Sequence, residues 1–181
     1  MNSFLWLFLS MSALTPLPRQ GEGELLFVYE PKHCLMPPCP QFRALEKDRQ
    51  SIADAGFDIG FHFDPMMHVD GWQDMYSRAV KEVFASVPHN KIKWMSMGAL
   101  RYQPQLKSIA MKRRPENTIF FDESVSGEDG KVRYLRQTRT EMFSFMNDLI
   151  KDLAPEVYTY LCMETKPVWE KSLGRLPDRA F

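Results

Sequence analysis

Two residues that can do chemistry, His62 and Asp64, stand at alternate positions of the apolar stretch Gly60-Phe-His-Phe-Asp-Pro65. Side chains two positions apart on a β-strand point to the same side, so the imidazole and the carboxylate would lie next to each other. An apolar stretch that stops at a proline is typical of the carboxyl end of a buried parallel strand. In α/β proteins, ligands and reacting groups collect at such ends. We therefore expect a ligand or a reaction at this point of the fold.

The next strand-like stretch, residues 91–97, also ends in small polar residues. Ser96 and Gly98 would let a ligand approach the backbone closely, because neither carries a bulky side chain. His62 and Asp64 also have a plainer interpretation. Asp64 would then cap the following turn, and His62 would be a hydrogen-bonded histidine of the core.

Three further predictions concern packing around these strand ends. Arg101 is expected to form a surface or structural ion pair. Glu164 follows the last predicted strand, where a buried carboxylate needs a partner. The tryptophans at positions 72, 94 and 169 are predicted to be core residues.

Strands and helices alternate along the chain from residue 41 onward. The apolar pattern predicts strands over residues 57–63, 91–97, 118–121 and 157–163. It predicts helices over residues 41–53, 70–84, 106–111, 140–153 and 166–173, with Asp70 as the N-cap of the second. Such alternation indicates right-handed βαβ units around a parallel sheet.

The predicted fold class is therefore α/β. A closed (β/α) barrel of eight strands takes about 250 residues. The strands predicted here make up about half of such a barrel. We predict that residues 41–181 form the C-terminal half of a partial (β/α) barrel, with about four parallel strands, helices and a hairpin excursion. A small open α/β sheet is the alternative.

The hairpin excursion is predicted around the polar turn Gly127-Glu-Asp-Gly130, which leads into Val132-Arg-Tyr134. The cations of a basic stripe follow the turn: Lys131, Arg133, Arg136 and Arg139. Such a stripe suits phosphate groups, and Tyr134 would be available to stack on a base. A solvated charge run with no ligand is the alternative.

The first forty residues differ from the rest. The apolar run Phe4–Leu14 is too short for a membrane helix, which needs about 20 residues. The segment that follows it has neither helical nor strand periodicity, and Pro37-Pro-Cys-Pro40 closes the region. We interpret residues 1–40 as a mis-started or frame-shifted leader. A signal or anchor segment and an ordinary flexible N-terminus are the alternatives.

The composition is that of a globular chain. Lys and Arg number 23, as do Asp and Glu, so no overall basic field indicates nucleic acid. Cysteines occur at positions 34, 39 and 162, with neither a disulfide framework nor a zinc-finger pattern. A cytoplasmic location, in a reducing environment and away from any membrane, is therefore expected.

Four separate segments together resemble one known family. They are Gly60-Phe-His-Phe-Asp-Pro65 with His68 and Gly71-Trp72, Ile92-Lys-Trp-Met-Ser-Met-Gly-Ala-Leu-Arg101, Gly130-Lys-Val-Arg-Tyr134, and Tyr160-Leu-Cys-Met-Glu164 with Val168-Trp-Glu170. In order and approximate spacing they resemble the C-terminal half of spore photoproduct lyase and its DNA repair photolyase-like relatives, in the radical SAM superfamily. The resemblance covers about residues 41–181.

The resemblance implies a DNA repair lyase that cleaves a thymine dimer by a radical mechanism. Enzymes of this family use S-adenosylmethionine (AdoMet) and a [4Fe-4S] cluster held by three closely spaced cysteines. By resemblance, Asp64, His62 and Ser96 contact AdoMet. Also by resemblance, the hairpin with Arg133 and Tyr134 enters damaged DNA. Lys131 and Arg136 of the basic stripe complete the set of predicted DNA-binding residues.

This sequence lacks the CxxxCxxC motif that binds the cluster in the family. The spacing of Cys34 and Cys39 does not fit it, and Cys162 lies on the last predicted strand. The catalytic residues are therefore left unassigned, and no metal ligand is predicted. We expect a chain that is not competent alone, either a fragment or one half of an enzyme whose N-terminal half is encoded separately.

Two other classes compete with the lyase. A metal-dependent barrel hydrolase would use His62, Asp64 and His68 as ligands, although the later strands offer no further histidine. A truncated gene product without catalytic activity is the other alternative.

Overall fold

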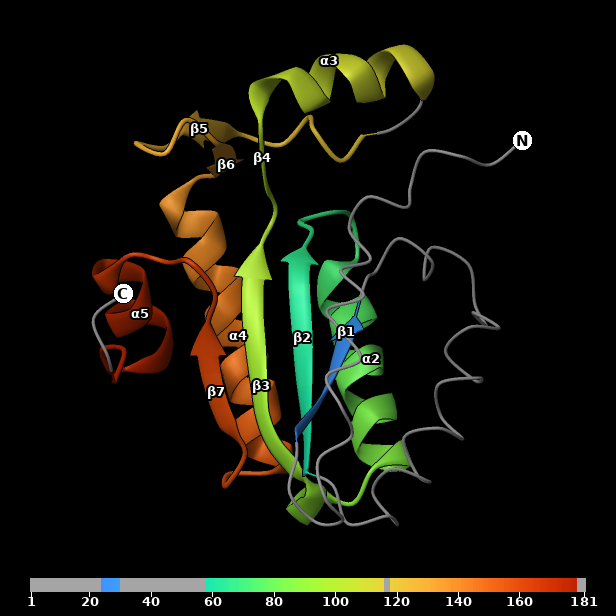
Figure 1. Cartoon of the computed structure of the whole chain (residues 1–181), viewed down its shortest axis with the longest axis vertical. Coiled ribbons are helices and arrows are strands. Elements are labelled where there is room, and N and C mark those ends of the chain that lie inside the picture. The colour runs from blue at the N-terminus through green and yellow to red at the C-terminus, as the bar shows by residue number, and fades with distance from the viewer. Residues whose placement is uncertain (1–23, 30–57, 116–117, 179–181) are drawn as a thin grey trace.

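A parallel sheet of four strands forms the centre of the protein, in the order β1-β2-β3-β7. The strands are β1 (Glu24–Tyr29), β2 (Asp58–Met66), β3 (Ile92–Ala99) and β7 (Tyr158–Leu161). The structure is a computed structural model that describes residues 24–29, 58–115 and 118–178. Figure 1 shows the carboxyl ends of β2 and β3 at the top.

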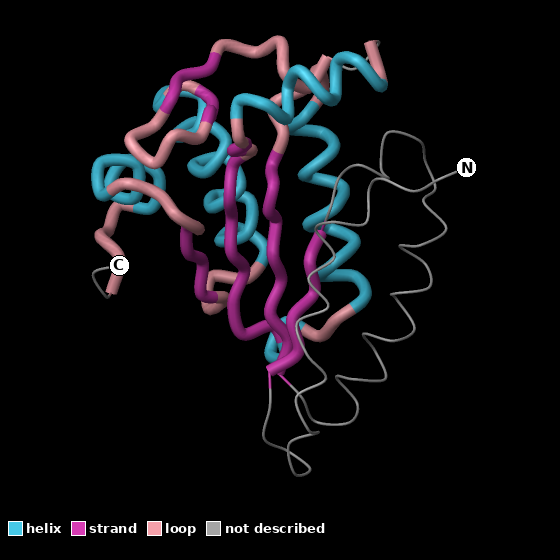
Figure 2. Tube along the Cα trace, turned by 45° about the horizontal axis from the view of Figure 1, so that its top comes forward, coloured by secondary structure: helices cyan, strands magenta, loops and turns pink. Residues whose placement is uncertain are grey.

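Helices cover one face of this sheet. They are α2 (Trp72–Ser86) and α4 (Arg136–Leu153), with α5 (Lys166–Leu173) packed against α4. Figures 1 and 2 show α2 and α4 on the same side of the strands and no described helix on the other side. The core fills the space between them. Alternate strand residues point into it, among them Phe61, Phe63, Met95, Met97 and Leu161.

The spacing of apolar residues explains why α2 forms and how it is oriented. Trp72, Met75, Tyr76, Ala79, Val80 and Val83 recur at helical intervals and are all buried. The prediction that Asp70 caps this helix is wrong. The N-cap is Gly71, whose positive φ of 73° suits a residue without a side chain.

A small antiparallel sheet lies beyond the carboxyl ends of the parallel strands (Figure 1). Its order is β4-β6-β5, formed by β4 (Arg101–Tyr102), β5 (Ser124–Ser126) and β6 (Val132–Tyr134). The predicted hairpin is therefore confirmed, whereas the sequence pattern gave no sign of β4. Helix α3 (Pro104–Arg113) connects β4 to the segment before β5, and the short 3-10 helix η2 (His89–Lys91) precedes β3.

The structure differs from the predicted elements at three further places. Residues 118–121 form a turn rather than a strand, because Phe120 packs on Tyr102 while Phe121 is exposed. Helix α4 begins at Arg136, four residues before the expected start at Thr140. Strand β1 lies within residues 1–40, where no strand was predicted.

The domain boundary at residue 40 stays a prediction, and the helix predicted over residues 41–53 lies outside the described residues. The parallel α/β architecture is confirmed, but the sheet formed by the described residues is open, so a barrel is not established. Within the described ranges, no helix has the length and apolar composition needed to cross a bilayer.

Candidate functional site

The second face of the parallel sheet is polar near the carboxyl ends of its strands. His62 and Asp64 lie on this face of β2, because the residues between and beside them point into the core. Ser96 is the direct neighbour of His62 on β3, and Tyr160 is the neighbour of Ser96 on β7. The structure thus brings together the three residues predicted for cofactor contact.

His62 lies at the centre of this group. Its Nδ1 shares a hydrogen bond with the hydroxyl of Ser96, and Nδ1 lies 3.9 Å from Sγ of Cys162. Burial lowers the pKa of His62, although the Asp64 carboxylate acts in the opposite direction. The neutral imidazole is therefore favoured, which can accept a proton or a hydrogen bond.

Asp64 and Arg101 form the charged part of the site. Arg101 Nη2 lies 3.9 Å from Asp64 Oδ2, and Arg101 Nη1 donates a hydrogen bond of 3.4 Å to the Cys162 carbonyl. The predicted ion pair of Arg101 is therefore confirmed. Burial raises the pKa of Asp64, opposed by the Arg101 guanidinium and by His62. Both side chains are about a quarter exposed, at 28% and 23%, so a ligand can reach them.

Two glycines make room for the site. A Cβ atom on Gly98 would collide with the Asp64 carboxyl group, and one on Gly60 would collide with the Trp94 indole. The Trp94 indole therefore lies over Gly60 of β2, on the polar face. The prediction that it belongs to the core is wrong, whereas Trp72 and Trp169 are core residues.

Aromatic rings border the polar group. The His62 imidazole makes edge contacts with Trp94, at 5.2 Å between ring centroids, and with Tyr160, at 6.4 Å. These rings offer an apolar surface beside a carboxylate, a guanidinium and a neutral imidazole. Such an arrangement can bind a small molecule that has both a planar ring and charged groups.

Cys162 is a member of the site that the sequence analysis did not select. Burial raises the pKa of its thiol, partly offset by a hydrogen bond with Ser96. The neutral thiol is therefore favoured over the thiolate, which is the nucleophilic form of cysteine. Its even spacing from Tyr158 and Tyr160 on the predicted strand was the signal that could have placed it on this face.

Tyr134 of the hairpin is buried, at 3% exposure, and this overturns the expectation that it is free to stack on a base. Its hydroxyl accepts a hydrogen bond of 3.2 Å from the His68 backbone, and its carbonyl accepts one from Arg139. Burial raises its pKa to about 12. Tyr134 therefore anchors the hairpin to the strand ends, while a role of the hairpin in DNA binding stays a prediction.

Arg139 does not belong to an exposed basic stripe, contrary to expectation. It is buried and pairs with Glu164, with Nε 2.8 Å from Oε1. Glu164 thus has the partner that the sequence analysis required for it. Removing either partner would leave the other charge buried and unpaired, which is costly.

The other predicted DNA-binding cations differ in their surroundings. Arg133 pairs with Asp129 across the hairpin turn, and its side chain is 14% exposed. Lys131 is half-buried, and Arg136 is exposed at the start of α4. Among the described residues, Lys131 and Arg136 form no ion pair, and each keeps at least part of its side chain accessible.

His68 lies away from His62, in the loop after β2. Its Nδ1 is 2.6 Å from Asp122 Oδ2, and its ring contacts Trp72 and Tyr134. In the described part of the chain, no three His, Cys, Asp or Glu residues are grouped closely enough to hold a metal ion. The ligand set predicted for a metal-dependent hydrolase is therefore not assembled.

A family comparison decides the relationship of this chain. The sequence model of the spore photoproduct lyase family matches residues 37–161. The chain belongs to this family. The predicted resemblance is thereby confirmed, and the match covers the four motif segments apart from the residues after Leu161.

Solved structures of spore photoproduct lyase share the fold. A cysteine-to-alanine mutant with dinucleoside spore photoproduct matches with a TM-score of 0.65 at 19% identity, over 78% of this chain and 46% of that chain. A double mutant with bound AdoMet and dinucleoside spore photoproduct matches at 0.59 and 18% identity, over 76% and 43%. The chain thus spans less than half the length of these structures. Among curated proteins, none matches the sequence.

Ligands for a [4Fe-4S] cluster are not provided by the described residues of this family member. Cys162 is the one cysteine among them, and its thiol lies next to the His62 imidazole. Cys34 and Cys39 lie outside the described residues. By contrast, the carboxylate, the guanidinium and the aromatic rings of the polar face fit a ligand with the charged groups and the planar base of AdoMet.

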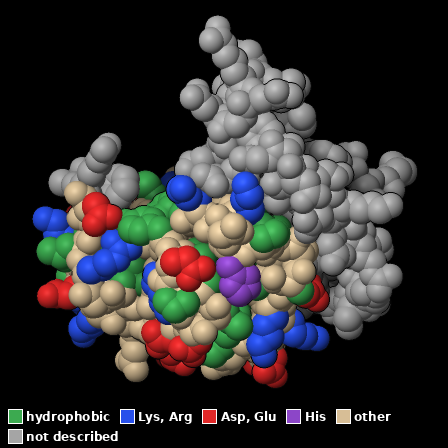
Figure 3. Space-filling model, turned by 90° about the horizontal axis from the view of Figure 1, so that it is seen from below, with side chains coloured by type: hydrophobic (Ala, Val, Ile, Leu, Met, Phe, Trp, Pro, Cys, Tyr) green, Lys and Arg blue, Asp and Glu red, His purple; other side chains and the backbone are tan. Residues whose placement is uncertain are grey.

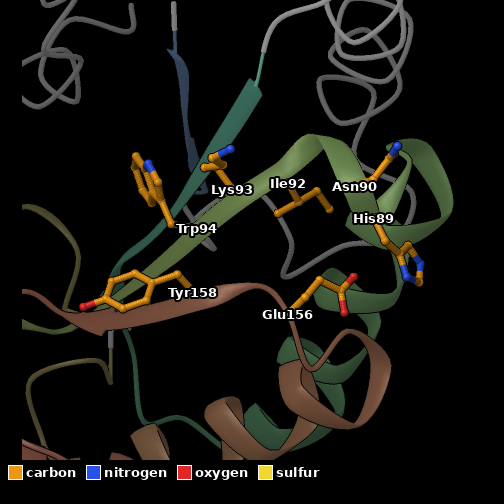
Figure 4. Close-up of a pocket in the computed structure, with 7 residues that line it drawn as sticks. All are labelled: His89, Asn90, Ile92, Lys93, Trp94, Glu156 and Tyr158. Carbon is orange, nitrogen blue, oxygen red and sulfur yellow. The ribbon is translucent and has the colours of Figure 1, made fainter.

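A separate cavity lies at the opposite end of the sheet. It has a volume of about 460 Å³ and is lined by residues at the amino ends of β3 and β7, among them His89, Lys93 and Glu156 (Figure 4). Trp94 and Tyr158 border it, but His62, Asp64, Ser96 and Arg101 do not. In open parallel α/β sheets, ligands bind at the carboxyl ends of the strands, so we assign the candidate site to the polar group rather than to this cavity.

Proposed function

We propose that this chain takes part in repair of a thymine lesion in DNA by the radical chemistry of spore photoproduct lyase. Membership of the family carries this proposal. The geometry supports it, because the polar group lies at the carboxyl ends of three parallel strands, on the face that no described helix covers. Acting on the lesion requires the cofactors of the family, AdoMet and an iron–sulfur cluster.

The polar face would hold AdoMet through its charged groups. Arg101 would pair with the carboxylate of the methionine part, and Asp64 would accept hydrogen bonds from its amino group or from ribose hydroxyls. When bound, AdoMet supplies the radical that starts lesion cleavage. Trp94 and Tyr160 would exclude water from one side of the ligand, and His62 would accept a hydrogen bond while staying neutral.

Binding experiments on the chain test this proposal. Equilibrium dialysis with labelled AdoMet and with dinucleoside spore photoproduct should show that both are retained, whereas undamaged thymidine dinucleoside is not. Asp64→Asn keeps the size of the side chain but removes its charge. It should weaken AdoMet binding at least about tenfold, since a charge-assisted hydrogen bond contributes about 1.5–3 kcal/mol.

Asp74→Asn is the matched control, because Asp74 lies exposed on α2, away from the polar face. It should leave AdoMet binding unchanged. Retention of neither ligand by the wild-type chain would overturn the proposal. Equal AdoMet affinity of wild type and Asp64→Asn would remove Asp64 from the cofactor site.

A further inference from the structure

Helix α3 stands out because it buries none of its ten residues. A helix this short is marginal alone in water and usually gains its stability by packing an apolar face. Here Leu106 and Ile109 are 42% and 47% exposed. Proline at its first position favours the start of the helix. The helix thus presents most of its surface to a partner or to solvent.

All charged residues in and next to α3 are cationic. From Leu100 to Pro115, the only charged residues are Arg101, Lys107, Lys112, Arg113 and Arg114, all of them cationic. Arg101 is engaged with Asp64. No ion pair among the described residues joins Lys107 or Lys112 to a carboxylate. Figure 3, a view from below, shows that acidic and basic side chains are interspersed at the opposite end of the molecule.

The position of α3 is fixed relative to the candidate site. Strand β4 leads into the helix and pairs with β6 of the hairpin, so that Tyr102 lies opposite Val132. Tyr102 before the helix and Phe120 after it are both buried and contact each other, at 4.8 Å between ring centroids. The helix and the hairpin thus rise from one small sheet, above the carboxyl ends of β2 and β3 (Figure 1).

We infer that α3 binds the phosphate backbone of DNA next to the strand segment that carries the lesion. The inference rests on the proposed function for the lesion itself. A cationic segment whose own sequence contains no acidic residue is complementary to a polyanion, and phosphate contacts position a protein on DNA without reading its sequence. Lys107 and Lys112 are the cations that the described structure leaves available for this contact.

Three ligands separate this inference from the proposed function. Dinucleoside spore photoproduct has no flanking phosphates. A duplex of about 12 base pairs with the lesion has both the lesion and flanking phosphates. The same duplex without the lesion has only the phosphates. Fluorescence anisotropy at several salt concentrations for the duplexes, and dialysis for the dinucleoside, give the affinities.

The double variant Lys107→Gln with Lys112→Gln should bind both duplexes about tenfold more weakly at low salt. Its log-log salt dependence should be flatter by about two units, one for each lost phosphate contact. Its affinity for the dinucleoside should equal that of the wild type. Lys81→Gln with Lys171→Gln removes the same charge from exposed positions on α2 and α5, and should leave all three affinities within about twofold.

Each other result has a separate meaning. If the double variant bound both duplexes with the affinity and salt dependence of wild type, the inference would be wrong and the proposed function would stand. A second possible result is that wild type binds both duplexes equally and does not retain the dinucleoside, while the double variant binds the duplexes more weakly than wild type. The inference would then hold, and the lesion-specific function would be wrong. If Leu106→Ser weakened binding without any effect of the lysines, α3 would be a docking surface for an apolar partner.

Discussion

The two faces of the parallel sheet use the same strands for different purposes. On the helix-covered face, Phe61, Phe63 and Met97 are buried completely or almost so. On the other face, the residues between them include His62 and Asp64, which keep part of their surface exposed and pair with polar neighbours. The period of two along a strand therefore separates the residues that stabilise the fold from those that can bind a ligand.

The largest difference between the two faces is expected in how much a substitution lowers the free energy of unfolding. Phe61→Ala should lower the free energy of unfolding by about 3–5 kcal/mol, because it removes a buried ring and leaves a cavity in the core. His62→Ala, one residue away, should cost only about 1–2 kcal/mol, chiefly through the lost hydrogen bond with Ser96. Urea denaturation of the two variants measures both values.

Equal losses from the two substitutions would contradict the division of the sheet into a structural and a functional face. A larger loss for His62→Ala would mean that the polar face is itself covered and packed like a core. Comparing the denaturant m-values of the variants with that of wild type would show whether the native state keeps its compactness.

A smaller loss of stability is expected from a substitution at Gly98, which makes room for the Asp64 carboxyl group on the polar face. Gly98→Ala would push a Cβ atom into the Asp64 carboxyl group, at a cost of about 1–3 kcal/mol. Asp64→Ala removes that group, so the double variant should be more stable than the sum of the single changes predicts. The resulting coupling energy should be about 0.5–3 kcal/mol.

If the two changes were additive, the collision would be relieved elsewhere, and Gly98 would not be what makes room for Asp64. Gly71→Ala is a useful comparison, since nothing lies near its Cβ position and only its positive φ of 73° opposes the substitution. Its cost should not change in the Asp64→Ala background.

The period of two was visible in β2, where it correctly placed His62 and Asp64 on one side of the strand. Apolar runs located β3 and β7, but they did not show which side of β3 faces the core, and Trp94 was wrongly assigned to it. Long-range pairings were not visible. Nothing near Arg139 reveals that its partner is Glu164, because 25 residues of helix and strand separate them along the chain. The burial of Tyr134 likewise depends on the backbone of His68, 66 residues earlier.

Short apolar runs gave the other errors. Thr118-Ile-Phe-Phe121 has the composition of a strand, but such a run does not say whether its aromatic residue pairs with a sheet or anchors a turn. The two-residue strand β4 is too short for any period to appear. Its position follows from pairing with β6, which is a property of the folded chain.

The smallest effects are expected in the pH dependence of stability, where His62 and Asp64 should act in opposite directions. Burial lowers the pKa of His62 below its ordinary value of 6.5, so the unfolded chain binds a proton more readily as the pH falls through 6.5. His62 therefore destabilises the native state toward acidic pH. Burial raises the pKa of Asp64 above 3.8, so the native chain keeps its proton longer as the pH rises above 3.8. Asp64 therefore destabilises the native state toward neutral pH.

Two substitutions separate these contributions. His62→Gln should make stability less sensitive to pH on the acidic side of 6.5, whereas Asp64→Asn should gain stability relative to wild type as the pH rises above 3.8. Urea midpoints measured from pH 4 to pH 8 would show the two slopes, with His89→Gln and Asp74→Asn as exposed controls. Parallel pH profiles for wild type and Asp64→Asn would mean that water or Arg101 fully compensates the burial of the carboxylate. The polar face would then be solvated like an ordinary surface, and the contrast between the two faces would reduce to packing alone.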